Sequence, residues 1–118
     1  MAKKIVIASG DSDPNRAYPV LIMASAAASA GVDVTLFYTM KGLEALKKDG
    51  AKKIEMPGAP PFEDLMKQCV DLGVKFTACS LALSVMGIKK EELVDFATPV
   101  GVATCIQEML EADKALYI

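Results

Sequence analysis

The chain has 118 residues, which is enough for one ordinary domain and too few for two. Hydrophobic residues make up 53% of the chain and charged residues 24%, a balance that excludes disorder and leaves apolar surface for both a core and a subunit interface. The formal charge of −2 gives no electrostatic reason to expect nucleic acid or an anionic membrane as a partner. We therefore expect one domain over residues 1–118.

Residues 3–9 form a near-continuous apolar run, which predicts a parallel strand covered on both faces. A turn follows, and Asp13 is expected to cap a helix that starts with a proline and ends at Gly31. Residues 33–38 predict the second strand. Thr39 is expected to cap a short helix after it. These elements already alternate in the manner of an α/β protein.

The proline-rich segment at residues 57–61 is expected to be an exposed loop, and the apolar spacing after it predicts a helix that ends at Gly73. Residues 74–87, VKFTACSLALSVMG, indicate a short strand followed at once by a short helix. Pro99 is expected to begin the last helix, and residues 114–118 predict a terminal strand. The apolar stripe of the last helix consists of Val102, Ile106, Met109 and Leu110.

Alternating strands and helices with short links predict parallel pairing, with helices on both faces of the sheet. We expect a single three-layer α/β/α sandwich with a mainly parallel sheet of four or five strands. No window reaches the length of apolar sequence that a membrane span needs. The short apolar run after the N-terminal lysines does not fit a signal peptide, so a cytoplasmic location is expected.

The residue types present exclude several kinds of chemistry. Histidine is absent, which removes histidine-dependent nucleophile pairs and histidine-based metal sites. The turn GDSDPN lacks the glycine pattern and the lysine of phosphate-binding loops, so no nucleotide is expected. Three cysteines without zinc-like spacing favour free thiols in a reducing compartment. We expect neither a metal nor a cofactor.

Cys79 is the cysteine best placed for chemistry, because it lies where a predicted strand ends and a helix begins. The first turn of a helix offers unpaired N–H groups and a partial positive charge, and both favour a thiolate. The alternative is that Cys79 is a small packed hydrophobe.

Of the other two cysteines, Cys69 is expected in the core. Helix and strand geometry separates it from Cys79 by about 12 Å, too far for a disulfide. Cys105 faces either the core or an interface.

Ligands of such sheets bind beyond the carboxyl ends of the strands. Residues 10–15, 39–42 and 79–81 meet this criterion and are expected to share a rim. Ser80 and Ser84 follow the thiol closely enough to donate hydrogen bonds to a sulfur or sulfonate group, although either serine could equally be a plain helix cap. The candidate substrate-binding residues are Gly10, Asp11, Ser80, Leu81 and Ser84.

Three runs, GVKFTACSLALSVMGI, KKIVIASGDSD and VDVTLFYTMKG, resemble the DsrE/DsrF-like family, especially its stand-alone peroxiredoxin-like branch. The resemblance covers nearly the whole chain in order. It implies an α/β sandwich that assembles as a homotrimer or homohexamer, similar to sulfur-relay subunits such as TusD and DsrE. In those proteins a cysteine in the matching place carries sulfur as persulfide or thiosulfonate and exchanges it with TusA-like carriers or rhodaneses. By residue match this role falls on Cys79.

Two functions are therefore open. The first is a sulfur carrier or sulfurtransferase, in which the N–H groups of Ser80 and Leu81 stabilise a thiolate at Cys79. The second is a non-catalytic oligomeric protein that binds a small ligand or partner at the rim, with Cys79 merely packed. Peroxide reduction is less expected, because the sequence shows no evident resolving cysteine.

Overall fold

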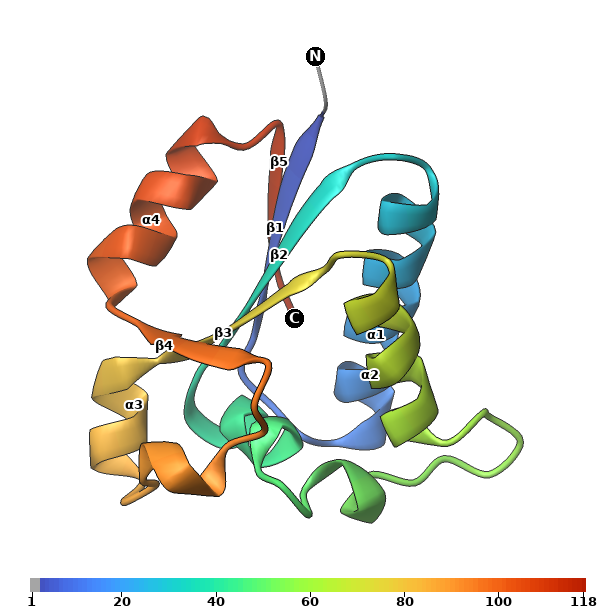
Figure 1. The fold of residues 1–118 in the computed structure, drawn as a ribbon, viewed down its shortest axis with the longest axis vertical. Helices are drawn as coiled ribbons and strands as arrows, with labels where there is room; N and C mark the ends of the chain where they lie inside the picture. Colours follow the sequence, from blue (N-terminus) through green and yellow to red (C-terminus); the bar gives the residue numbers. More distant parts are fainter. Residues whose placement is uncertain (1–2) are drawn as a thin grey trace.

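A computed structural model describes residues 3–118 of the chain as one sheet with helices on both faces (Figure 1). The strands are β1 (Lys4–Ser9), β2 (Asp33–Tyr38), β3 (Lys75–Cys79), β4 (Ala97–Val100) and β5 (Lys114–Tyr117). The α-helices are α1 (Pro14–Ser29), α2 (Phe62–Asp71), α3 (Ser80–Val85) and α4 (Val102–Glu111). Three short 3-10 helices are η1 (Met40–Leu46), η2 (Ala51–Lys53) and η3 (Lys90–Glu92).

The sheet has five strands in the order β4-β3-β2-β1-β5, and all of its pairings are parallel. Helices α1 and α2 cover one face, and α3 and α4 lie on the other (Figure 1). The predicted three-layer sandwich is confirmed. Among residues 3–118, no helix has the length and apolar character needed to cross a membrane.

Local sequence explains why α1 and α2 begin and end where they do. Asp13 accepts a hydrogen bond from the backbone N–H of Asn15 at 2.8 Å, as an N-cap residue should, and Pro14 follows as the first helical residue. Gly31 and Gly73 follow the two helices with positive φ angles of 86° and 88°, a conformation that glycine adopts without steric cost.

The predicted start of the last helix at Pro99 is wrong. Pro99 lies inside β4, pairs with Ala78 of β3, and α4 begins only at Val102. A proline has no N–H to donate to a ladder, so it is tolerated in a strand only where one side is unpaired. Strand β4 meets this condition because it lies at the edge of the sheet.

Helices α1 and α2 contribute more buried residues to the core than α3 and α4 do. Tyr38 of β2 stacks on Phe76 of β3 with ring centroids 6.1 Å apart, and Tyr18 of α1 meets Phe62 of α2 edge to face at 5.2 Å. The α3/α4 layer is covered less completely, since its two helices leave several apolar side chains exposed.

Candidate thiol site at the end of strand β3

Cys79 is the last residue of β3 and the N-cap residue of α3. Its Cα partner on the neighbouring strand is Val100, the last residue of β4. Side chains alternate along a strand, so Thr77 and Cys79 project to one face and Phe76 to the other. Phe76 stacks on Tyr38, whose raised pKa is due to burial and to Cys69 of α2. Cys79 therefore faces the α3/α4 side.

The surroundings of Cys79 differ from the expected thiolate site. The residue is only 4% exposed, and its side chain makes no capping hydrogen bond to the first turn of α3. Helix α3 has six residues, so few peptide dipoles add up at its start. The helix start contributes less to stabilising a thiolate than the sequence suggested.

Two of the predicted substrate-binding residues, Ser80 and Leu81, adjoin Cys79 directly. The Ser80 hydroxyl donates a hydrogen bond to the backbone carbonyl of Val100 at 2.9 Å, so it ties α3 to the end of β4. This contact is not a helix cap, because the N-cap residue of α3 is Cys79. Leu81 is 69% exposed, and Ser84 is exposed on the same short helix. The surface of α3 beside Cys79 is therefore exposed to solvent, whereas the thiol itself is buried.

Gly10 and Asp11 lie two strands away from Cys79, about 10 Å at the usual strand spacing. The ring of Tyr117 occupies the space that a Cβ atom of Gly10 would take. Asp13 donates its backbone N–H to the Asp11 carboxylate at 2.9 Å, which lowers the pKa of Asp11. Both residues share the carboxyl edge of the sheet with Cys79 without adjoining it.

The other two cysteines lie on opposite sides of the sheet. Cys69 is fully buried in the α1/α2 layer, where its thiol donates to the Leu21 carbonyl at 3.6 Å, and burial raises its pKa to about 11. Cys105 belongs to α4 and is buried, which resolves the open choice between core and interface in favour of the core. Burial, the Glu108 carboxylate and Cys79 together raise the pKa of Cys105. Cys105 therefore shares the face of Cys79, and Cys69 does not.

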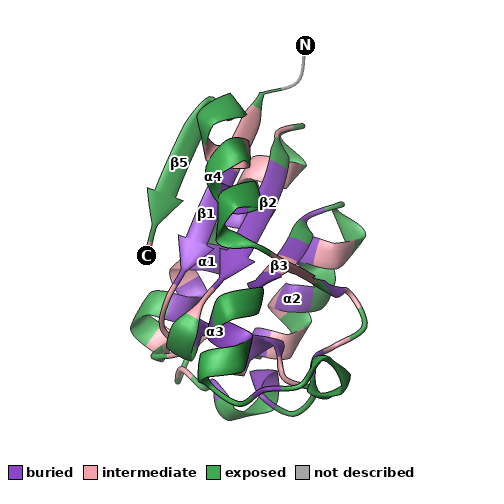
Figure 2. Ribbon diagram, turned by 90° about the vertical axis from the view of Figure 1, so that its left-hand side faces the viewer, coloured by how far each residue is buried: buried purple, intermediate pink, exposed green. Residues whose placement is uncertain are grey.

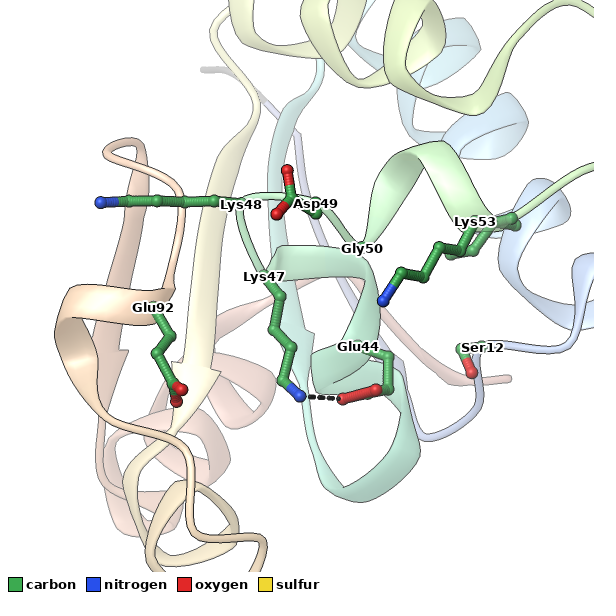
Figure 3. Close-up of a pocket in the computed structure, with 9 residues that line it drawn as sticks. Ser12, Glu44, Lys47, Lys48, Asp49, Gly50, Lys53 and Glu92 are labelled. Carbon is green, nitrogen blue, oxygen red and sulfur yellow. Dashed lines mark ion pairs between the residues drawn. The ribbon is translucent and has the colours of Figure 1, made fainter.

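A cleft of about 450 Å³ lies between η1, η2 and η3, and none of the predicted site residues lines it. Its lining carries three lysines and three carboxylates, and Figure 3 shows the ion pair between Lys47 and Glu44 at 2.9 Å. A balanced set of exposed charges favours no particular ligand. In the described part of the chain, no three histidine, cysteine or carboxylate side chains gather in a way that could hold a metal ion.

Comparisons with known proteins agree with the fold. A sequence model of the DsrE/DsrF-like family matches residues 1–118. The YrkE protein of Bacillus subtilis (strain 168) is 26% identical in a 153-residue alignment that covers 97% of this chain and 94% of that protein. The MJ0989 protein of Methanocaldococcus jannaschii is 25% identical, with 95% of each chain covered.

Two solved structures are similar over their whole length. The YchN protein of E. coli has a TM-score of 0.78 at 20% identity, and the comparison covers 100% of both chains. The MTH1491 protein of Methanobacterium thermoautotrophicum also has a TM-score of 0.78, at 17% identity, with 97% of this chain and 98% of that chain covered. At these identities the likeness bears on the fold alone.

Proposed function

The chain belongs to the DsrE/DsrF-like family, and from this premise we propose that it carries sulfane sulfur on Cys79 and passes it to an acceptor thiol. The observation that supports this most directly is the position of Cys79 at the carboxyl end of β3. Ligands of parallel sheets bind at that edge. The resemblance of the surrounding run to the sulfur-relay members of the family supports the choice of Cys79.

The chemistry needs one cysteine and no external redox agent. A thiolate at Cys79 attacks the outer sulfur of a persulfide or polysulfide donor and forms a new sulfur–sulfur bond. The donor's own sulfur–sulfur bond breaks, and a thiolate leaves from a persulfide or a shorter polysulfide anion from a polysulfide. An acceptor thiolate then attacks the outer sulfur of the Cys79 persulfide. The sulfur moves to the acceptor, and the Cys79 thiolate is restored.

The surface next to the Cys79 sulfur carries exposed apolar side chains. Leu81 and Val85 of α3 are mostly exposed although both are large and apolar, so they form a surface on which an acceptor protein can bury area. The acceptors that the family resemblance favours are TusA-like carriers or rhodaneses. Because Cys79 is nearly buried, transfer requires a small opening movement at the start of α3.

A homo-oligomer is part of this proposal. Helix α4 exposes Val102, Ile106 and Leu110, which recur every fourth residue and therefore lie along one side of the helix. Figure 2 shows α3, α4 and β5 together on the exposed face. An apolar stripe on a short helix is costly in water. A second copy of this chain is the occupant we propose, in a homotrimer or homohexamer.

Intact mass measurement tests the sulfur carrier. After incubation with inorganic polysulfide and desalting, the wild-type chain is expected to gain the mass of one or more sulfur atoms, and Cys79→Ser is expected to gain none. Cys69→Ala is the matched control, since it removes a buried cysteine from the opposite face and should leave the adduct unchanged. The absence of an adduct on the wild type, or an equal adduct on Cys79→Ser, would contradict the proposal.

The burial of Cys79 favours a second candidate function. With 4% of its surface exposed and no capping hydrogen bond, Cys79 also fits a packed residue in a non-catalytic oligomeric protein that binds a ligand or partner at the rim. The same experiment separates the two functions, because a packed, inert thiol takes up no sulfur.

A further inference from the structure

Helix α4 carries a second thiol, Cys105, which is the one buried residue of that helix. Nothing in the sulfur-carrier chemistry requires a thiol there. Three large apolar residues of the helix, Val102, Ile106 and Leu110, are exposed, whereas its buried position carries a cysteine. A helix that packs on a sheet normally presents larger aliphatic side chains to it. A cysteine at this buried position is therefore unexpected for packing alone.

Strand register brings the chain around Cys105 next to Cys79. Cys79 pairs with Val100, and only Gly101 separates Val100 from the start of α4. The backbone N–H of Cys105 donates to the Gly101 carbonyl, which fixes Cys105 one turn into the helix. The Ser80 hydroxyl holds Val100 from the other side. The end of β3 and the first turn of α4 are thus connected through the same short segment.

The two thiols also occupy the same layer. Strand alternation directs Cys79 to the α3/α4 face, and α4 lies over that face (Figure 1). Each of the two residues is 4% exposed. Burial raises the pKa of Cys105, and Glu108 and Cys79 raise it further, which agrees with two thiols in one layer. Cys69 lies across the sheet and has no such relation to Cys79.

We propose that Cys105 is the second thiol of the site and that it discharges a sulfane sulfur from Cys79 by closing an intramolecular disulfide. This step rests on the proposed carrier function. The Cys105 sulfur attacks the Cys79 sulfur, the bond from Cys79 to the outer sulfur breaks, and the outer sulfur leaves with the Cys105 proton as hydrogen sulfide. The outer sulfur is reduced to sulfide while the two cysteines are oxidised to a disulfide, so atoms and electrons balance.

The consequence is that the chain releases its bound sulfur as hydrogen sulfide when no acceptor binds. Burial keeps Cys105 protonated at neutral pH, because a thiolate is poorly solvated in an apolar layer. Discharge is then slower than transfer to an accessible acceptor thiolate. A thiol reductant reopens the disulfide and returns the chain to its starting state.

The first test follows the lifetime of the Cys79 adduct. Wild type, Cys105→Ser and Cys69→Ala are loaded with inorganic polysulfide, desalted, and followed by intact mass and by release of hydrogen sulfide. Wild type and Cys69→Ala are expected to lose the adduct with one hydrogen sulfide per chain and to form a bond between residues 79 and 105. Cys105→Ser is expected to keep the adduct about tenfold longer, because the intramolecular nucleophile is gone. Equal lifetimes in wild type and Cys105→Ser would overturn the inference.

The second test does not depend on sulfur transfer. The thiol oxidant diamide is added to the reduced wild type, which is then denatured, alkylated and mapped by peptide mass. A bond between Cys79 and Cys105 within one chain supports the paired thiols even if no variant ever takes up polysulfide, in which case only the carrier function fails. Free Cys79 and Cys105 after oxidation overturn the inference. Thermal melting confirms that Cys105→Ser is folded, and Cys105→Ala serves as a second variant.

Discussion

The contact between η1 and the end of β1 can be tested by adding a single methyl group. Gly42 is buried in η1, and a Cβ atom placed on it would overlap the backbone carbonyl oxygen of Ser9 and lie 2.9 Å from the carbonyl carbon. The same atom would stand 3.3 Å from the backbone nitrogen of Asp11. All three of these atoms belong to the backbone, so no side-chain rotation can make room. Gly42→Ala therefore forces the whole segment away from the strand.

The expected cost follows from what moves with Gly42. Leu43 and Leu46 of η1 are fully buried, so a shift of the segment disturbs the core as well as the contact itself. Overpacking of this kind costs about 2–3 kcal/mol in the free energy of unfolding. In a domain of this size that lowers the melting temperature by about 8–15 °C.

Urea unfolding followed by circular dichroism measures the effect. Gly101→Ala is the matched control, because a Cβ atom at Gly101 would have no neighbour within 4 Å in the described part of the chain and the φ angle is −76°. Its free energy of unfolding should stay within about 1 kcal/mol of the wild type. If Gly42→Ala were as stable as this control, η1 would not lie against Ser9 as described.

Two further predictions concern a buried hydroxyl and the exposed stripe. Tyr38→Phe should leave the free energy of unfolding unchanged or raise it by up to about 1 kcal/mol, since the buried Tyr38 hydroxyl has no hydrogen-bond partner among residues 3–118. Tyr18→Phe should lower it by about 1 kcal/mol, because the Tyr18 hydroxyl donates to the Pro60 carbonyl at 2.8 Å. Equal changes for the two variants in urea unfolding would refute this account. Leu110→Lys should dissociate the proposed oligomer in light scattering, whereas Ile22→Lys on α1 should not, and a monomeric wild type at micromolar concentration would count against the oligomer.

Much of the fold was predictable because each buried strand is a distinct apolar run with a turn signal after it. Strand β4 was missed because Pro99 is as well suited to a helix start as to an edge strand, and only the position of the strand in the sheet decides between them. The error also hid the relation of Cys105 to Cys79. Placing the helix start at Val102 moves Cys105 into the first turns, beside the end of β3.

The depth of the candidate site could not be predicted from the sequence. The residues flanking Cys79 predict the junction of a strand and a helix. Helix α4, which lies on the same face of the sheet, comes from a segment more than twenty residues later. Periodicity likewise identified the apolar stripe of α4 without showing which way it faces. The stripe lies in solvent at Val102, Ile106 and Leu110, since the helix turns Cys105 to the sheet instead.

The pairing of β1 with β5 has a consequence for how the chain folds. Ile5 and Lys114 are partners in the sheet although more than one hundred positions separate them. The hydrogen bonds on one side of β1 can therefore form only after the far end of the sequence is in place. Contacts of such long range form late and slow the folding of a domain. During synthesis one side of β1 stays open to other chains until β5 emerges, which makes this strand the point where premature association would begin.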